Sequence, residues 1–313
     1  MAAPVPHVPS IRELLASAKV SDIPLPGKVV VLSSSQTPAE AFAVLVTERI
    51  LSAPVRVAGS REYCGILDVR DLISFVVFGE TEVAHTNLIE IVGAGEKMYK
   101  EAIEGVTVSY MARRNPFHPV KEDASLLAVA EKLAKGTHRV PVVNAEGDVI
   151  NIISQSSLVK FLIKNQSKLA VDLSRKIAEL NIGTTPVMSI SSTCSALDAF
   201  KILDRTRRSG IAVTDPSGRL LTSTSGQDLK LWLKNPNSGL LKDSILHFLQ
   251  KIRATEIDIT APVLSIAQGS TLQLALNKLA ATRSHRIFVV DKEGRPVRCV
   301  SLTDILRQVL KSQ

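Results

Sequence analysis

Long apolar segments are missing from this sequence. The longest apolar run, Leu72–Phe78, is far shorter than the roughly 20 residues that a membrane-spanning helix needs. The first residues, Met1–His7, lack the basic start and apolar stretch of a secretory signal. We therefore expect no membrane contact and a location inside the cell, in the cytoplasm with the nucleus as a further compartment.

Cysteine and aromatic residues are scarce. The three cysteines, Cys64, Cys194 and Cys299, are far apart and have no neighbours at metal-ligand spacing, so we expect core thiols and no metal site. Aromatic residues make up only 4% of the chain, and long basic runs are missing. Nucleic-acid binding is therefore not expected, because single-stranded bases need aromatic stacking platforms. The net charge of +8 still favours anions, including phosphates in a pocket.

Signatures of common enzyme classes are missing as well. The chain has no glycine-rich phosphate loop ending in Lys-Ser/Thr, no His-Glu-x-x-His and no nucleophile elbow. We therefore expect a binding protein without catalytic residues and without a resident cofactor.

The sequence does contain one pattern that returns four times. Each copy predicts a short strand, a helix, two strands joined by a turn, and a second helix. Apolar residues at helical spacing, such as Leu127, Ala130 and Leu133, mark the first helix. Small polar residues before each first helix favour a helix start, and these lie at Gln36–Pro38, Asp123–Ser125, Ser192–Ser195 and Gln268–Thr271.

Runs of β-forming residues follow the first helix in every copy, at Ala53–Val57, Val140–Val143, Gly210–Val213 and Ile287–Val290. In copies two to four, a segment with Asn or Asp first and Gly last predicts a type I turn. The next strand then enters the last helix through a common format. A small oxygen-bearing residue occupies the N-cap and a second stands three positions later, at Asp68–Asp71, Ser154–Ser157, Ser225–Asp228 and Ser301–Asp304.

One copy is too small to bury both of its helices, so the copies should pack in pairs. We predict an N-terminal extension at residues 1–19, a first pair at 20–165 and a second pair at 180–313. Ser10–Glu13 should begin a short helix in the extension. Residues 79–115 form a longer insert in which we expect a helix.

This pattern resembles tandem cystathionine-β-synthase (CBS) motifs, and four in one chain are similar to the gamma subunit of AMP-activated protein kinase. The resemblance covers nearly the whole chain and is carried by Ile182–Thr184, His138–Val143, His285–Val290 and Val300–Leu306. It implies an α+β fold in which four β-α-β-β-α motifs pair into two Bateman domains that form a flat disc. It also implies adenine nucleotides (AMP, ADP or ATP) between motifs, and kinase catalytic and scaffold subunits as partners.

The resemblance assigns roles to particular residues. The family's ribose-binding carboxylate falls on Asp71, Asp228 and Asp304, whereas copy two has Ser157, where the family also lacks an aspartate. The phosphate-approaching or capping positions of the family fall on His138, Arg139, His285, Arg286, Ser225, Ser301 and Thr184.

Three residues in two motifs depart from the family pattern. Leu51 stands where the family usually has arginine, and Ser156 and Ser157 replace expected basic residues. Fewer bound nucleotides than in the family would follow from these changes.

Each of these residues also has a purely structural interpretation. An acid in the first helical turn favours the helix dipole and completes a capping arrangement, and this role is compatible with ribose binding. Arginine forks and histidine donors suit phosphate, which favours a phosphate-binding role for the His-Arg pairs over the alternative of solvated surface groups. For Arg205–Arg208 an ordinary basic helix end is favoured over a role in a positive field.

The leading hypothesis is a regulatory, energy-sensing subunit that binds AMP, ADP or ATP and passes the binding to a partner kinase. A stand-alone CBS scaffold for protein partners is the main alternative, motivated by Leu51 and Ser156. A sensor of another adenosyl ligand, such as S-adenosylmethionine, is the third. Which positions are occupied, and whether AMP or ATP is preferred, stays open.

Overall fold

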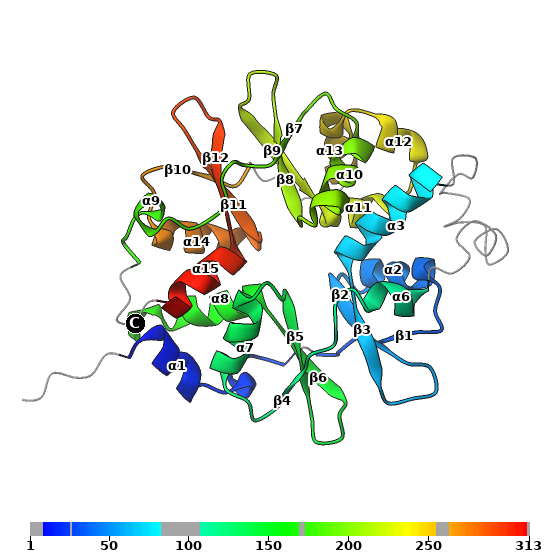
Figure 1. The fold of residues 1–313 in the computed structure, drawn as a ribbon, viewed down its shortest axis with the longest axis vertical. Helices are drawn as coiled ribbons and strands as arrows, with labels where there is room; N and C mark the ends of the chain where they lie inside the picture. The colour runs from blue at the N-terminus through cyan, green and yellow to red at the C-terminus, as the bar shows by residue number, and fades with distance from the viewer. Residues whose placement is uncertain (1–8, 26, 83–106, 169–172, 255–262, 312–313) are drawn as a thin grey trace, which may run out of the picture. The chain divides into compact units, whose positions relative to one another are not determined.

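The computed structural model describes residues 9–25, 27–82, 107–168, 173–254 and 263–311. In these ranges the chain forms an α+β fold with four three-stranded sheets, one for each copy of the repeat (Figure 1). In every sheet the first two strands are parallel and the last two are antiparallel. The predicted β-α-β-β-α repeat is therefore confirmed four times, and we number the four copies motifs 1 to 4.

The motifs share one order of elements. Motif 1 consists of β1 (Leu32–Ser33), α2 (Pro38–Thr47), β2 (Ser52–Arg56), β3 (Tyr63–Asp68) and α3 (Val69–Glu82). Motif 2 consists of β4 (Val120–Lys121), α7 (Leu126–Ala134), β5 (Arg139–Val143), β6 (Val149–Ser154) and α8 (Gln155–Lys164). Motif 3 consists of β7 (Ser189–Ser191), α10 (Ala196–Thr206), β8 (Gly210–Thr214), β9 (Leu220–Ser225) and α11 (Gly226–Trp232). Motif 4 consists of β10 (Ser265–Ala267), α14 (Leu272–Thr282), β11 (Arg286–Val290), β12 (Pro296–Ser301) and α15 (Leu302–Lys311).

Further helices lie outside the motifs: α1 (Ile11–Ser17), η1 (Val20–Asp22), α6 (Val108–Ala112), η2 (Gln166–Lys168), α9 (Ile177–Leu180), α12 (Ser238–Lys242) and α13 (Ile245–Arg253). The helix predicted in the N-terminal extension is α1, which has a complete capping box at Ser10 and Glu13. In the predicted insert, α3 continues to Glu82 and α6 precedes motif 2, while residues 83–106 lie outside the described residues.

Local hydrogen bonds explain why the first helices start where predicted. The hydroxyls of Thr37, Ser125, Ser195 and Thr271 each accept a hydrogen bond from the backbone N–H three residues later. Each bond satisfies an N–H that has no partner inside the helix. The three predicted turns close similarly, because the N–H of Gly147, Gly218 and Gly294 donates to the carbonyl three residues earlier.

The described chain divides into two compact units, each assembled from separate segments. Unit 1 contains residues 1–29, 118–187 and 264–313, and thus motifs 2 and 4. Unit 2 contains residues 30–117 and 188–263, and thus motifs 1 and 3. These units differ from the predicted pairs 20–165 and 180–313, because the contacts that define them run between helices of non-consecutive motifs. Whether consecutive motifs also pair as Bateman domains stays a prediction.

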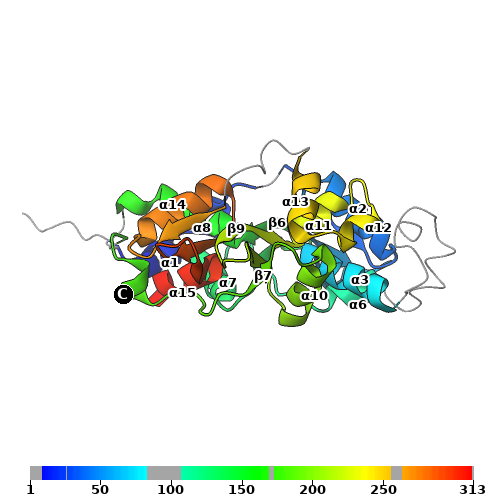
Figure 2. The ribbon, with the colours of Figure 1, turned by 90° about the horizontal axis from the view of Figure 1, so that it is seen from above.

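Unit 1 is held by helices from motifs 2 and 4. α7 packs on α15, α8 packs on α14 and α15, and α1 covers α7 (Figures 1 and 2). Their shared core includes Leu15, Leu126, Leu158 and Leu306, all almost fully buried. Burying one such side chain contributes roughly 1.5 to 3 kcal/mol. A polar link adds to this core, since Nε of Arg307 donates to the carbonyl of Ala134 at the end of α7, at 2.7 Å.

Unit 2 has the equivalent arrangement for motifs 1 and 3. α3 packs on α10 and α11, and α13 covers both of those helices (Figure 1). Phe200 and Phe248 meet edge to face in its core, with ring centroids 5.5 Å apart, a favoured aromatic geometry. Lys230 links the motifs, because its Nζ donates to the carbonyl of Ile50 at 2.8 Å.

The cysteines differ from their prediction in one respect. All three are free thiols, but each is half-buried rather than enclosed in a core. Cys64 and Cys194 pack against the edge of the unit 2 core, and Cys299 lies on β12 in register with Phe288.

Candidate functional site

The predicted acids all lie where the last strand of a motif enters its last helix. In each of the four junctions, the side chain three positions after the cap accepts a hydrogen bond from the cap residue's own backbone N–H. The distances are 2.8 Å for Asp68 to Asp71, 2.8 Å for Ser154 to Ser157, 2.8 Å for Ser225 to Asp228 and 2.9 Å for Ser301 to Asp304. The capping interpretation is thus confirmed at every junction. The ribose role stays a prediction. The three acids differ in the further contacts that their carboxylate oxygens make.

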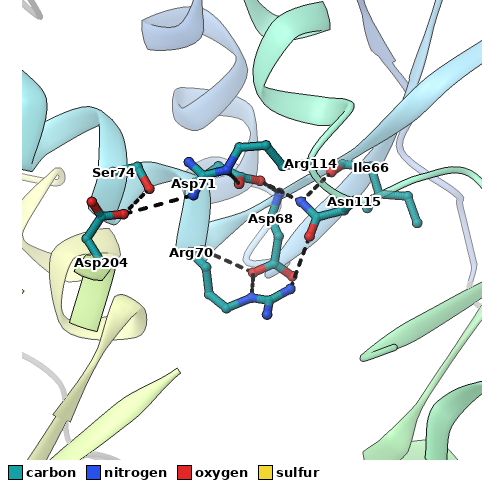
Figure 3. A network of polar contacts seen from close by, with 8 residues as sticks. All are labelled: Ile66, Asp68, Arg70, Asp71, Ser74, Arg114, Asn115 and Asp204. Atoms are coloured by element: carbon teal, nitrogen blue, oxygen red, sulfur yellow. Dashed lines mark hydrogen bonds and ion pairs between the residues drawn. The ribbon is translucent and has the colours of Figure 1, made fainter. Parts of the chain in front are cut away.

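Asp71 lies in a buried polar network at the start of α3 (Figure 3). Its Oδ2 also accepts from Nδ2 of Asn115 at 2.9 Å, and its Oδ1 is 3.9 Å from Nε of Arg114. The side chain is almost fully buried. Asn115 is itself fixed, since its Nδ2 donates to the carbonyl of Ile66 at 3.0 Å and its Oδ1 accepts from Arg70 at 3.2 Å. Asp71 therefore faces protein donors.

Burial dominates the ionisation of Asp71. Loss of hydration raises its pKa from 3.8 to about 7, because a low-dielectric surrounding disfavours the charged form. The hydrogen bond from the Asp68 N–H lowers the pKa, whereas the nearby Asp68 carboxylate raises it further. The positive charges of Arg114 and Arg70 lower it. The carboxyl group therefore keeps its proton to a much higher pH than an exposed aspartate does.

Arg114 extends the network to motif 3. Its Nη2 lies 4.0 Å from Oδ1 of Asp204 on α10, and the hydroxyl of Ser74 on α3 donates to the same carboxylate (Figure 3). The segment after α6 thereby connects the two motifs of unit 2 through polar contacts.

Asp228 in motif 3 is engaged by Arg253, the last residue of α13. Nε and Nη2 of Arg253 donate to Oδ1 of Asp228 at 2.9 and 2.7 Å. The Asp228 side chain is 4% exposed, and its Oδ2 also accepts from the hydroxyl of Thr224 at 3.1 Å. The predicted cap Ser225 is confirmed, since its hydroxyl accepts from the N–H of Gln227 at 3.3 Å.

Asp304 in motif 4 has a simpler environment. Its Oδ2 accepts from the hydroxyl of Ser301 at 2.6 Å in addition to the backbone bond. Within the described part of the chain, Oδ1 makes no hydrogen bond or ion pair, and the residue is half-buried. The hydroxyl of Ser301 also accepts from the N–H of Asp304 at 3.3 Å, so the helix cap predicted at Ser301 is confirmed. One carboxylate oxygen of Asp304 is left over.

Thr184 lies along the strand that leads to Asp304. Its N–H donates to the carbonyl of Cys299 at 2.8 Å, and its carbonyl accepts from the N–H of Cys299 at 3.0 Å. Asn115 has the equivalent place in motif 1, because its carbonyl accepts from the N–H of Ile66 on β3 at 2.9 Å. The segment before motif 2 therefore runs beside β3 of motif 1, and the segment before motif 3 runs beside β12 of motif 4.

Gly183 permits this close approach. It adopts φ +96°, and a Cβ there would lie 2.6 Å from the carbonyl oxygen of Cys299. We expect Gly183→Ala to lower the free energy of unfolding by about 2 kcal/mol, because both the left-handed backbone and the overlap are unfavourable. Urea denaturation of the two proteins measures this loss.

Gly147→Ala is the matched control for this change. Gly147 also has a positive φ, +84°, but has nothing within 4 Å of the added Cβ, so only the backbone cost of about 1 kcal/mol applies. Equal losses in the two variants would contradict a tight contact at Gly183.

The His-Arg pairs of motifs 2 and 4 both belong to unit 1. Arg139 is in register with Ser154, and Arg286 with Ser301, so each pair lies beside the start of its motif's last helix. The carbonyls of His138 and His285 accept from the first residues of α8 and α15 at 3.3 and 3.0 Å. The four side chains are half-buried.

Gln155 connects these two helix starts. Its Nε2 donates to the hydroxyl of Thr303 in α15 at 2.8 Å, and to the carbonyl of Thr137 at 3.3 Å. A small cavity lies nearby between α8, α14 and α15, lined in part by Ser156, Lys160, Arg283 and Ser284. At about 10 Å³ this cavity holds at most about one water molecule, and Lys160 and Arg283 are exposed beside it.

The remaining residues singled out in the sequence lie at the edge of the unit 2 core and on its surface. Leu51 is half-buried against the unit 2 core, and its carbonyl accepts from the N–H of Val69. Arg205 and Arg207 are exposed at the end of α10, which agrees with an ordinary basic helix end. Asn115 and Arg253 were not predicted, because both are distant in sequence from the acids that they contact.

No described helix combines the length and hydropathy required to cross a bilayer.

Comparison with known proteins gives relatives across most of the chain. Protein SDS23 of Meyerozyma guilliermondii is 29% identical over 90% of this chain and 57% of the relative. The Schizosaccharomyces pombe protein sds23/moc1 is 28% identical over 90% of this chain and 72% of the relative. Against several of these fungal proteins, the chain spans about half of the relative's length.

Solved structures share the fold. A protein of Methanocaldococcus jannaschii, described as a candidate archaeal homologue of g-AMPK, is 17% identical and superposes with a TM-score of 0.68 over 93% of this chain and 99% of that one. A conserved protein of Pyrococcus horikoshii reaches a TM-score of 0.54 at 15% identity, with the same coverage. At these identities the likeness concerns the fold.

The match to a protein family is more direct. The model of the CBS domain matches residues 20–77, 108–164 and 254–311, which together exceed half of the chain and cover all of motifs 2 and 4 and most of motif 1. Motif 3 repeats the same order of strands and helices, with the same parallel and antiparallel pairing. The chain is therefore a member of the CBS-domain family.

Proposed function

We propose that this protein is a regulatory subunit that binds an adenine nucleotide and communicates the bound state to a protein kinase complex. The observation that carries the proposal is the junction of α8 and α15 in unit 1. There each His-Arg pair lies beside the start of one of the two helices. A hydrogen bond from Gln155 to Thr303 connects the two helix starts.

A nucleotide requires two kinds of partner. Its ribose hydroxyls are donors that a carboxylate accepts, and Oδ1 of Asp304 is available for this. Its phosphates require cations, and Arg139 and Arg286 lie beside the starts of α8 and α15. Membership of the CBS family and the fold shared with the archaeal protein support the same reading.

Regulation would follow from linkage. A nucleotide that binds one arrangement of unit 1 more tightly shifts the population towards that arrangement, and a partner that distinguishes the arrangements reads the shift. Such coupling between sites typically amounts to about 1 to 3 kcal/mol. On this proposal the protein works in the cytoplasm or nucleus as a non-catalytic subunit.

Calorimetric titration of the full chain with AMP and with ATP tests the proposal. We expect saturable binding, and we expect Asp304→Asn to weaken AMP binding by about 10- to 100-fold, because charge-assisted hydrogen bonds are worth roughly 1.5 to 3 kcal/mol. The asparagine keeps an acceptor for the Ser301 cap, so the helix start should survive. Glu293→Gln, an exposed change in the same motif, should leave the affinity unaltered. No heat at millimolar AMP and ATP would refute nucleotide binding.

A scaffold for protein partners is the second candidate. It is favoured by the internal contacts of Asp71 and Asp228 and by the absence of a basic side chain at Leu51 and Ser156. A scaffold predicts that partners are retained whether or not nucleotide is present and that Asp304→Asn leaves their binding unchanged. Competition of bound AMP by S-adenosylmethionine distinguishes the third candidate, a sensor of another adenosyl ligand.

A further inference from the structure

Two of the three predicted ribose acids are already occupied by side chains of the protein itself. We infer that Arg253 and Asn115 take the ribose positions of motifs 3 and 1, so that this chain offers a nucleoside only the acid of motif 4. The inference deepens the proposed function and rests on it for the statement about motif 4.

Arg253 is the stronger of the two internal occupants. Besides its two bonds to Asp228, its Nη1 donates to the hydroxyl of Thr222 at 3.1 Å and its Nη2 to the carbonyl of Ser223 at 2.8 Å. The guanidinium group is thus fixed on β9 and on the acid together. Its side chain is only 20% exposed, so its charge is poorly compensated by water.

Displacing Arg253 would therefore be unfavourable. A ribose hydroxyl is a neutral donor, and it would replace a charge-assisted bond with a weaker one. It would also leave a half-buried guanidinium without its counter-ion, which is costly in a low-dielectric setting. Motif 3 consequently prefers its own arginine to a nucleoside.

Asn115 acts similarly in motif 1 through a neutral amide. Its Nδ2 reaches both Asp71 and the carbonyl of Ile66, while its backbone pairs with β3. In motif 4 the corresponding segment carries Thr184, and no described side chain of that segment reaches Asp304. The segment beside motif 1 thus has an asparagine where the segment beside motif 4 has Thr184. This difference decides whether the acid of the motif can still accept a hydrogen bond from a ligand.

Native mass spectrometry of the full chain with AMP as the probe tests this inference. We expect one AMP per chain. Asp228→Asn should change the AMP dissociation constant by less than threefold, whereas Asp304→Asn should raise it by at least tenfold. Two or more AMP molecules per chain, or a tenfold loss of affinity in Asp228→Asn, would overturn the inference.

A chain that binds no AMP would refute the proposed function, and a second measurement then decides the role of Arg253. A double-mutant cycle compares unfolding of the original chain, Arg253→Met, Asp228→Asn and the double variant. We expect the pair to be coupled by about 100-fold or more in the unfolding equilibrium constant, as for a buried ion pair. Coupling below about threefold would show that Arg253 does not occupy Asp228.

Discussion

Arg253→Met should lower the free energy of unfolding by about 3 to 5 kcal/mol, the usual loss when one partner of a buried ion pair is removed. Methionine fills much of the volume of the arginine stem but provides no donor. Asp228, 4% exposed, would then keep a buried charge with only the Ser225 N–H and the Thr224 hydroxyl as partners. Guanidinium chloride denaturation followed by circular dichroism measures the change.

Lys251→Met is the matched control, because it removes one positive charge from the same helix, α13, at an exposed position. Its effect should stay within about 0.5 kcal/mol, as for other surface changes. A loss for Arg253→Met as small as that of the control would show that the ion pair contributes little to stability.

Asp71 should make the protein less stable as the pH rises from about 4 to about 7. Between the ordinary pKa of 3.8 and the raised value of about 7, the folded state holds a proton that the unfolded chain has released. The free energy of unfolding therefore falls with pH in this window and is level above it. Three pKa units correspond to at most about 4 kcal/mol.

The Asp71→Asn variant isolates this contribution. Asparagine is uncharged at all pH values, and its Oδ1 can still accept from the N–H of Asp68 and the amide of Asn115. We expect the variant to be less sensitive to pH than the original chain, and more stable relative to it at pH 8 than at pH 5. Glu48→Gln, an exposed change in the same unit, should keep the original pH dependence. Parallel stability profiles for Asp71→Asn and the original chain would contradict a raised pKa.

Features set by neighbouring residues could be predicted from the sequence. Thr37, Ser125, Ser195 and Thr271 act as caps through bonds to residues three positions away, and the four strand-to-helix junctions follow the same logic. The turns at Gly147, Gly218 and Gly294 are equally local. The resemblance to CBS motifs depended on specific residues within this repeat, and the family model confirms it.

The partners of the acids could not be predicted, because they depend on contacts between distant segments. Arg253 is 25 residues from Asp228, and Asn115 is 44 from Asp71. Nothing near Arg253 in the sequence distinguishes it from a basic residue that stabilises the end of a helix. The grouping of motifs 1 with 3 and 2 with 4 has the same origin, since it depends on how amphipathic helices pack.

The segmented composition of the two units bears on how the chain acquires its structure. Unit 1 takes its first helix from the beginning of the described chain and its last from the end, and unit 2 is interleaved between them. During synthesis, α1 and motif 2 must wait for α14 and α15 before their apolar faces are covered. We therefore expect the core of unit 1 to be completed only after motif 4 has been translated.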